Sequence, residues 1–127
     1  GLFDALLIKE NHIASEGSIA GAVAAARRAS PTLPVEIEVE SLTELDAALA
    51  AGVERVLLDN FSLTDLERAV ALNRDAAEPA ELEASGGVEI DDLASIAATG
   101  VDFVSVGALT KHLRATDYSM RFEFGVG

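Results

Sequence analysis

The sequence predicts an α/β fold, a partial (β/α) barrel of about five parallel strands with intervening helices and an extra C-terminal strand. Short aliphatic runs recur along the chain, and segments with helical spacing of apolar residues separate them. Capping residues and glycines stand where those segments begin and end. Strands that alternate with helices are typical of βαβ units, which build a parallel sheet.

The strands are expected where β-branched or aliphatic residues cluster. These runs are residues 5–8, 35–39, 55–58, 80–83 and 103–106. The tail differs, because Tyr118, Met120, Phe122 and Phe124 alternate with polar residues, a period typical of a half-buried strand. We therefore assign residues 1–115 to the later part of a barrel and 116–127 to a C-terminal strand or tail.

The helices are expected between these runs. They span residues 18–29, 41–52, a segment that begins at Ser62 or Thr64, and about 90–98 before Gly100, and a short helical segment is expected at 110–114. The second begins with Ser41-Leu42-Thr43-Glu44, a capping box in which a hydroxyl and a carboxylate accept bonds from free amides. Residues 73–79 are expected to form a loop.

Either a barrel or an open doubly wound sheet satisfies this order of elements. A complete barrel needs eight units, more than this sequence supplies. A half-barrel leaves two open sheet edges, which proteins normally cover. The chain also begins without Met, at Gly1, and leads almost at once into a strand. We expect it to be part of something larger or to self-associate.

The composition excludes several partners. A net charge of −13 argues against a nucleic-acid backbone or an anionic membrane as a partner, although a local basic site for an anionic substrate remains compatible with it. The absence of cysteine excludes disulfides and thiolate metal sites. No segment reads as a signal peptide or a membrane span. These features suit a cytoplasmic protein.

Lys9 is the most informative residue. It is one of only two lysines in a chain with 22 carboxylates, and it ends the first apolar run. A lysine buried there costs several kcal/mol of desolvation unless an anion meets it. The alternative is an ammonium that extends from the strand end into water.

Polar residues follow the other strands at the edge where parallel α/β sheets bind ligands. Glu38, Asp59 and Glu83 stand at or near the ends of successive strands. Each carboxylate alone is more often a helix cap or a solvated group. Their recurrence at successive strand ends predicts a shared cavity.

Two glycine turns are suited to phosphate. The turn Ser85-Gly86-Gly87 follows one strand, and Gly107-Ala108-Leu109 follows the last. Glycines let backbone amides approach an anion, and donors at a helix N-terminus attract phosphate. Either turn alone is weak support, since such glycines usually only reverse the chain.

Neither histidine predicts a catalytic triad or a zinc site. His12 is expected to be a hydrogen-bonded wall residue and His112 a surface residue. A loosely held Mg²⁺, bound by Glu38 or Asp59 together with phosphate oxygens, suits hard oxygen ligands better.

Taken together, these segments resemble the quinolinate phosphoribosyltransferase family, the carboxylating nicotinate-nucleotide pyrophosphorylases of NAD biosynthesis. The resemblance rests on DALLIKENH (4–12), VEIEVE (35–40), LDNF (58–61), LEASGG (82–87), TGVDFVSVGALT (99–110) and DYSMRF (117–122). The family fold is an N-terminal sandwich domain followed by an α/β barrel, and this chain is similar to the later part of that barrel.

The resemblance implies a role for each matching residue. Lys9 would meet the carboxylate of quinolinate. Glu38 and Asp59 would lie near the ribose and Mg²⁺ of phosphoribosyl pyrophosphate. Phosphate would contact the two glycine turns, with Glu83 beside them. The reaction implied joins quinolinate to the phosphoribosyl group and releases carbon dioxide and pyrophosphate, giving nicotinate mononucleotide.

The sequence also departs from the family. The family's arginine-lysine-threonine segment, its histidine-arginine pair and an arginine from the N-terminal domain are absent, and one lysine cannot replace bidentate arginine recognition. We expect no activity from this chain alone. The resemblance implies a homodimer or higher homo-oligomer for the full-length protein. A paralogue with another acceptor and a non-catalytic phosphate-binding fragment are the alternatives.

Overall fold

Within residues 4–86, 92–106 and 111–116, which the computed structural model describes, six strands form one sheet in chain order. The first five pair in parallel and the sixth is antiparallel to the fifth. They are β1 (Leu6–Ile8), β2 (Val35–Val39), β3 (Arg55–Asp59), β4 (Glu81–Ser85), β5 (Phe103–Val106) and β6 (Lys111–Arg114). The predicted α/β class and the five parallel strands are confirmed.

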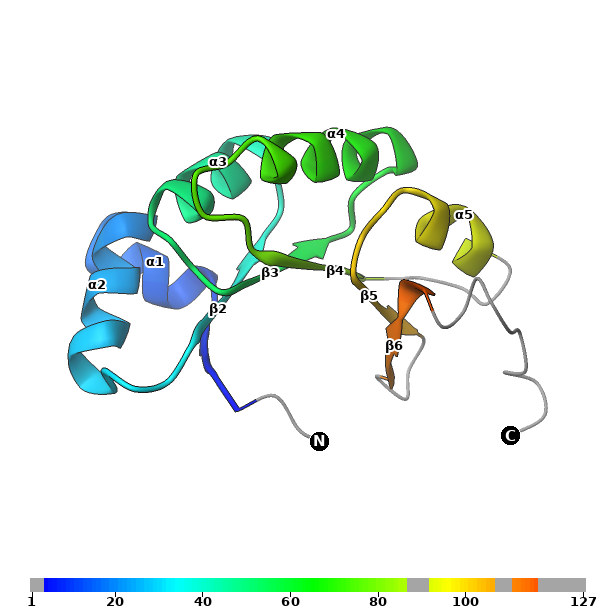
Figure 1. Cartoon of the computed structure of the whole chain (residues 1–127). Coiled ribbons are helices and arrows are strands. Elements are labelled where there is room, and N and C mark those ends of the chain that lie inside the picture. Colours follow the sequence, from blue (N-terminus) through cyan, green and yellow to red (C-terminus); the bar gives the residue numbers. More distant parts are fainter. Residues whose placement is uncertain (1–3, 87–91, 107–110, 117–127) are drawn as a thin grey trace.

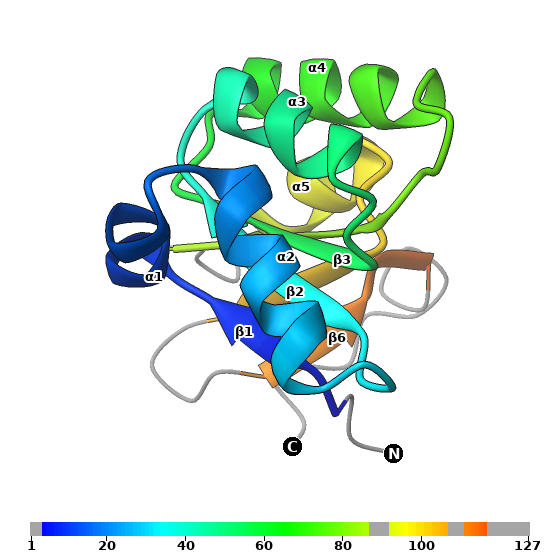
Figure 2. The ribbon, with the colours of Figure 1, turned by 90° about the vertical axis from the view of Figure 1, so that its left-hand side faces the viewer.

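The helices lie along one side of the curved sheet (Figure 1). They are α1 (Glu10–Glu16), α2 (Ile19–Ala29), α3 (Leu42–Ala50), α4 (Leu63–Arg74) and α5 (Leu93–Ala98). Helix α2 packs against β1 and β2 (Figure 2). Helix α3 packs against β2 and β3, and α5 against β5. No helix in the described ranges is long and apolar enough to cross a membrane.

Helix ends follow the predicted chemistry. The Ser18, Ser41 and Ser62 hydroxyls each accept a backbone N–H at the start of α2, α3 and α4. Glycines with positive φ, Gly52 and Gly100, stand just beyond α3 and α5. These caps explain why three of the helices begin where the sequence predicts.

The two faces of the sheet differ in chemistry because side chains alternate along a strand. On β2, Val35, Ile37 and Val39 are fully buried beneath the helices, whereas Glu36 and Glu38 lie on the opposite side. We call that opposite side the inner face. By the same alternation it carries Leu7, Glu36, Glu38, Arg55, Leu57, Asp59, Glu81, Glu83, Ser85, Phe103 and Ser105.

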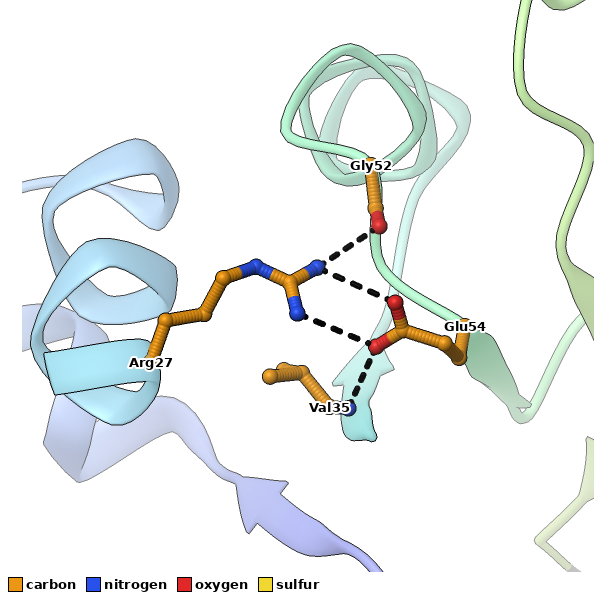
Figure 3. A network of polar contacts seen from close by, with 4 residues as sticks. All are labelled: Arg27, Val35, Gly52 and Glu54. Atoms are coloured by element: carbon orange, nitrogen blue, oxygen red, sulfur yellow. Dashed lines mark hydrogen bonds and ion pairs between the residues drawn. The ribbon is translucent and has the colours of Figure 1, made fainter. Parts of the chain in front are cut away.

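A polar network ties the amino-terminal ends of β2 and β3 to α2 (Figure 3). The Arg27 guanidinium contacts both carboxylate oxygens of Glu54, at 3.3 and 3.2 Å, and donates to the Gly52 carbonyl at 2.7 Å. Glu54 Oε1 also accepts the Val35 N–H at 2.6 Å. Charge-assisted bonds of this kind are stronger than neutral ones. They fix the end of the sheet opposite to the candidate site.

Two elements differ from the sequence prediction. The prediction of a short helix at 110–114 is wrong, because Lys111–Arg114 forms strand β6, which pairs with β5. The open edge of β5 offers unpaired backbone groups, and pairing places Leu113 against the core. Helix α1 was not predicted, because none of its residues is buried and its sequence lacks an apolar stripe.

Candidate functional site

The carboxyl-terminal ends of β1 to β4 bring the predicted site residues to one edge of the sheet. Lys9 follows β1, Glu38 lies near the end of β2, and Asp59 and Ser85 are the last residues of β3 and β4. Lys9 is exposed, and the other three are partly buried. Because these strands are parallel, their ends lie on the same side of the sheet.

Asp59 and Gly86 are in close contact at this edge. Asp59 pairs with Ser85 across β3 and β4, and the Asn60 N–H donates to the Ser85 carbonyl at 2.9 Å. A Cβ on Gly86 would overlap Asp59 Oδ1 and lie 2.9 Å from the Asn60 nitrogen. Asn60 and Gly86 both have positive φ, 60° and 83°, so the two strands end in left-handed turns side by side.

The Ser85 hydroxyl is a candidate hydrogen-bond donor to a ligand. Its oxygen is buried, and no hydrogen-bond partner for it occurs among residues 4–86, 92–106 and 111–116. A buried hydroxyl without a partner is costly, whereas a bound anion would accept a hydrogen bond from it. This donor stands next to Gly86, which is exposed, and the Asp59 carboxylate occupies the space that a side chain on Gly86 would fill.

Carboxylates crowd the same edge. The pKa of Glu40 is raised above its ordinary value, chiefly by the negative charge of Glu10, with smaller effects from burial, Asp59, Glu44 and Glu38. Glu40 was not among the predicted site residues. It lies two residues beyond Glu38, so the alternation Glu36-x-Glu38-x-Glu40 was the signal in the sequence. The edge is strongly acidic and suited to a cation or to a developing positive charge.

Lys9 joins β1 to α1. Its carbonyl accepts the N–H groups of His12 and Ile13, and its own N–H donates to His12 Nδ1 at 3.1 Å. His12 is therefore hydrogen-bonded, as expected, but it is exposed and serves as a helix cap. These backbone contacts anchor Lys9 while its side chain stays exposed at the edge.

Glu83 lies two residues before the end of β4 and is more deeply buried than the other candidate residues that the structure describes. Its side chain is 0% exposed, its Oε2 accepts the Ser105 hydroxyl, and its Oε1 lies 3.8 Å from Arg55 Nη1. Arg55 is also largely buried, at 7% exposed. Sequence reasoning missed Arg55, although an arginine that opens an otherwise apolar run, Arg55-Val56-Leu57-Leu58, was a visible signal.

The remaining predicted residues lie outside the described ones. These are Gly87, Gly107, Ala108 and Leu109, together with the tail strand expected at 118–124. For a metal, the described ranges contain no group of three or more acidic or histidine side chains placed to hold one. The predicted ligands Glu38 and Asp59 both lie at this edge of the sheet, and Mg²⁺ binding by their hard oxygens stays a prediction.

Comparison with known proteins agrees with this geometry. The family model described as quinolinate phosphoribosyl transferase, C-terminal domain, matches residues 1–121. The chain belongs to this family. Nicotinate-nucleotide pyrophosphorylase [carboxylating] from Mycobacterium leprae is 46% identical over 120 residues, which are 94% of this chain and 42% of that protein. The human protein of the same name is 37% identical over 117 residues, 91% of this chain and 39% of its own length.

Solved structures support the quinolinate phosphoribosyltransferase assignment. The nicotinate-nucleotide pyrophosphorylase from Francisella tularensis superposes with a TM-score of 0.77 and 50% identity, over 90% of this chain and 40% of that one. A thiamine phosphate pyrophosphorylase from Pyrococcus furiosus, 20% identical with a TM-score of 0.63, shares the fold. The chain thus spans about 40% of the length of the family members it matches.

Proposed function

We propose that this chain supplies the phosphoribosyl-pyrophosphate side of a quinolinate phosphoribosyltransferase site. The observation that carries the proposal is the contact between Asp59 and Gly86, flanked by the Ser85 hydroxyl. It joins a carboxylate suited to the ribose to a turn suited to phosphate. In the complete protein the products would be nicotinate mononucleotide, carbon dioxide and pyrophosphate.

The bond changes define what the residues must do. The ring nitrogen of quinolinate attacks the anomeric carbon, and the bond to pyrophosphate breaks with its electron pair leaving on oxygen. The carboxylate beside the ring nitrogen is then lost as carbon dioxide, and a proton takes its place on the ring carbon. Positive charge develops on the ribose as pyrophosphate leaves.

Glu38 and Asp59 are the groups that would stabilise that charge. Both are carboxylates on the inner face at the carboxyl-terminal edge, and both are held on strands. Carboxylates already in position need no reorganisation as the charge develops. Mg²⁺, when bound with phosphoribosyl pyrophosphate, would neutralise pyrophosphate charge beside these two residues.

Lys9 would hold the acceptor. Its ammonium is exposed at the same edge, so a carboxylate of quinolinate can reach it without burying an unpaired charge. The Ser85 hydroxyl and the backbone around Gly86 would donate to phosphate, with Gly87 and the turn Gly107-Ala108-Leu109 proposed as further phosphate contacts and Glu83 supporting them from beneath. We also propose that the complete protein is a homo-oligomer.

Isothermal titration calorimetry tests the proposal. The chain should bind phosphoribosyl pyrophosphate in the presence of Mg²⁺ and bind quinolinate weakly, since Lys9 is the only cation among the candidate residues. Asp59→Asn and Glu38→Gln should each weaken phosphoribosyl-pyrophosphate binding without unfolding the chain. Glu67→Gln, an exposed change on α4, is the matched control.

The same titration separates the alternatives. Binding of phosphoribosyl pyrophosphate that is insensitive to Asp59→Asn and Glu38→Gln would indicate a phosphate-binding fragment and contradict the proposed site. Binding of a different pyridine or purine acid in preference to quinolinate, by the complete protein, would indicate a paralogue. A folded chain that binds no phosphoribosyl pyrophosphate at all would refute the proposal.

A further inference from the structure

A charged network lies on the inner face beneath the carboxyl-terminal edge. Arg55 on β3 contacts Glu81 Oε1 at 3.0 Å through Nη2 and lies 3.8 Å from Glu83 Oε1 through Nη1, both on β4. Its guanidinium carbon stands 4.3 Å from the centre of the Phe103 ring on β5. The Arg55 side chain therefore links its own strand to β4 and β5.

The position of Glu83 depends on this network. Its carboxylate is fully buried, and a buried carboxylate is stable only when charged or hydrogen-bonding partners meet it. Ser105 donates to one oxygen from β5, and Arg55 pairs with the other from β3. The hydrogen bonds from Ser105 to Glu83 and from Arg55 to Glu81 are directional, so they resist sliding of β4 along its neighbours more than apolar packing would.

The network is close enough to the carboxyl-terminal edge to affect the positions of the site residues there. Ser85 lies two residues beyond Glu83, about 7 Å along the strand, and Asp59 lies four beyond Arg55, about 13 Å. Between Asp59 and Gly86 there is no spare room, because even a Cβ on Gly86 would overlap the carboxylate. A small shift of β4 against β3 would therefore separate or crowd these two groups.

We propose that Arg55 is a positioning residue of this site. Through Glu83 and Phe103 it sets how β3, β4 and β5 lie against one another, and so where Asp59 stands relative to the Ser85–Gly86 turn. Arg55 itself lies about 13 Å along β3 from Asp59, so the role assigned to it involves no contact with substrate. The inference rests on the proposed function and adds a residue to it.

Three variants test the proposal. Arg55→Met keeps most of the side-chain length and removes the charge, whereas Arg55→Lys keeps the charge and loses the planar fork. Leu66→Ala is the control, because Leu66 is buried in α4 on the opposite side of the sheet from the network. Its replacement should destabilise the fold without changing any contact of Arg55. Two readouts apply to each: the affinity for phosphoribosyl pyrophosphate with Mg²⁺, and hydrogen exchange of the Asn60 amide, which bonds to Ser85 across the two strands.

Arg55→Met should weaken the affinity at least about tenfold relative to Leu66→Ala at equal fraction folded, with partial recovery in Arg55→Lys. Exchange of the Asn60 amide should accelerate in Arg55→Met beyond the change in global stability, and Leu66→Ala should show no such excess. Equal exchange in the two variants overturns the proposal. If the parent chain binds no phosphoribosyl pyrophosphate, the proposed function fails, and the exchange comparison alone still decides the role of Arg55. If Arg55→Met does not fold, Arg55→Lys against Leu66→Ala decides it by the same exchange measurement.

Discussion

Asp59 and Gly86 occupy neighbouring strand ends so closely that only glycine fits beside the carboxylate. The contact joins the acidic part of the edge to the turn suited to phosphate. It also explains two features of the backbone, because Asn60 and Gly86 both turn with positive φ at the same level of the sheet. Changing either residue therefore tests geometry and binding together.

Gly86→Ala should lower both stability and affinity for phosphoribosyl pyrophosphate. A positive φ costs a non-glycine residue about 1 kcal/mol or more, and the new Cβ must also displace Asp59. Gly17→Ala is the matched control, since Gly17 has φ 82° and nothing within 4 Å of its added Cβ. Urea unfolding should show a larger loss for Gly86→Ala, and calorimetry should show weaker binding only there. Equal losses would mean that the Asp59 contact has no energetic effect.

Glu54 should make the fold sensitive to acid. Burial alone would raise its pKa, but the Val35 N–H and Arg27 outweigh it and hold the pKa below the ordinary 4.5. A carboxyl with a lowered folded-state pKa stabilises the fold above pH 4.5, and that contribution is lost as the pH falls through the folded-state value. Glu54→Gln should cost about 1 kcal/mol of unfolding free energy at neutral pH.

The pH dependence separates the loss of the charged Glu54 contacts from a general destabilisation by the substitution. The difference between the parent chain and Glu54→Gln, measured by urea unfolding, should shrink below pH 4.5. Glu67→Gln, an exposed change on α4, should show little difference at any pH. A Glu54→Gln deficit that persists undiminished at pH 3 would contradict the assignment.

Lys9 should contribute to the binding of quinolinate and not to that of phosphoribosyl pyrophosphate. In the complete protein, Lys9→Ala should raise the KM for quinolinate and leave the affinity for phosphoribosyl pyrophosphate nearly unchanged, because its ammonium is the cation proposed to meet a carboxylate. Stability should change by less than about 0.5 kcal/mol, since the side chain is exposed. Steady-state kinetics with both substrates varied measures the split. The 127-residue chain alone should show no turnover, and robust turnover would contradict this account.

The edge at β1 should promote self-association. Within the described ranges β1 pairs only with β2, and its inner-face residue Leu7 is 40% exposed. An apolar groove of about 280 Å³, lined in part by Leu6, Ala22 and Ala26, borders the same strand. Sedimentation velocity should show concentration-dependent association that Leu7→Glu weakens. Leu63→Glu on α4, where Leu63 is 46% exposed, should not weaken it, and a clean monomer at all concentrations would contradict the prediction.

Much of the fold was predictable because periodicity and caps act locally. The alternation in Val35–Val39 indicates which side chains are buried, and the serines at 18, 41 and 62 mark helix starts. Strand β6 was not predictable, since four residues carry no decisive period and the open edge of β5 determines their pairing. Tertiary context overrides local preference in such short segments.

The residues at the strand ends of the candidate site were predictable, whereas the buried contacts beneath them were not. The strand ends identify Lys9, Glu38, Asp59 and Ser85 as neighbours. That Glu83 is buried beneath them, held by Arg55 and Ser105, depends on contacts between strands that are far apart in sequence. The close contact between Gly86 and Asp59 likewise could not be predicted, because a glycine after a strand is consistent with many kinds of turn.

The strand order has a consequence for how this domain forms. Each strand from β2 to β6 pairs with the strand that precedes it in the chain, so none of the pairings seen in the described part of the chain waits for a distant segment. Contacts between segments close in sequence cost little loop-closure entropy and form quickly. During synthesis the sheet can grow one strand at a time, from β1 onward. Each new unit then meets a template that is already folded.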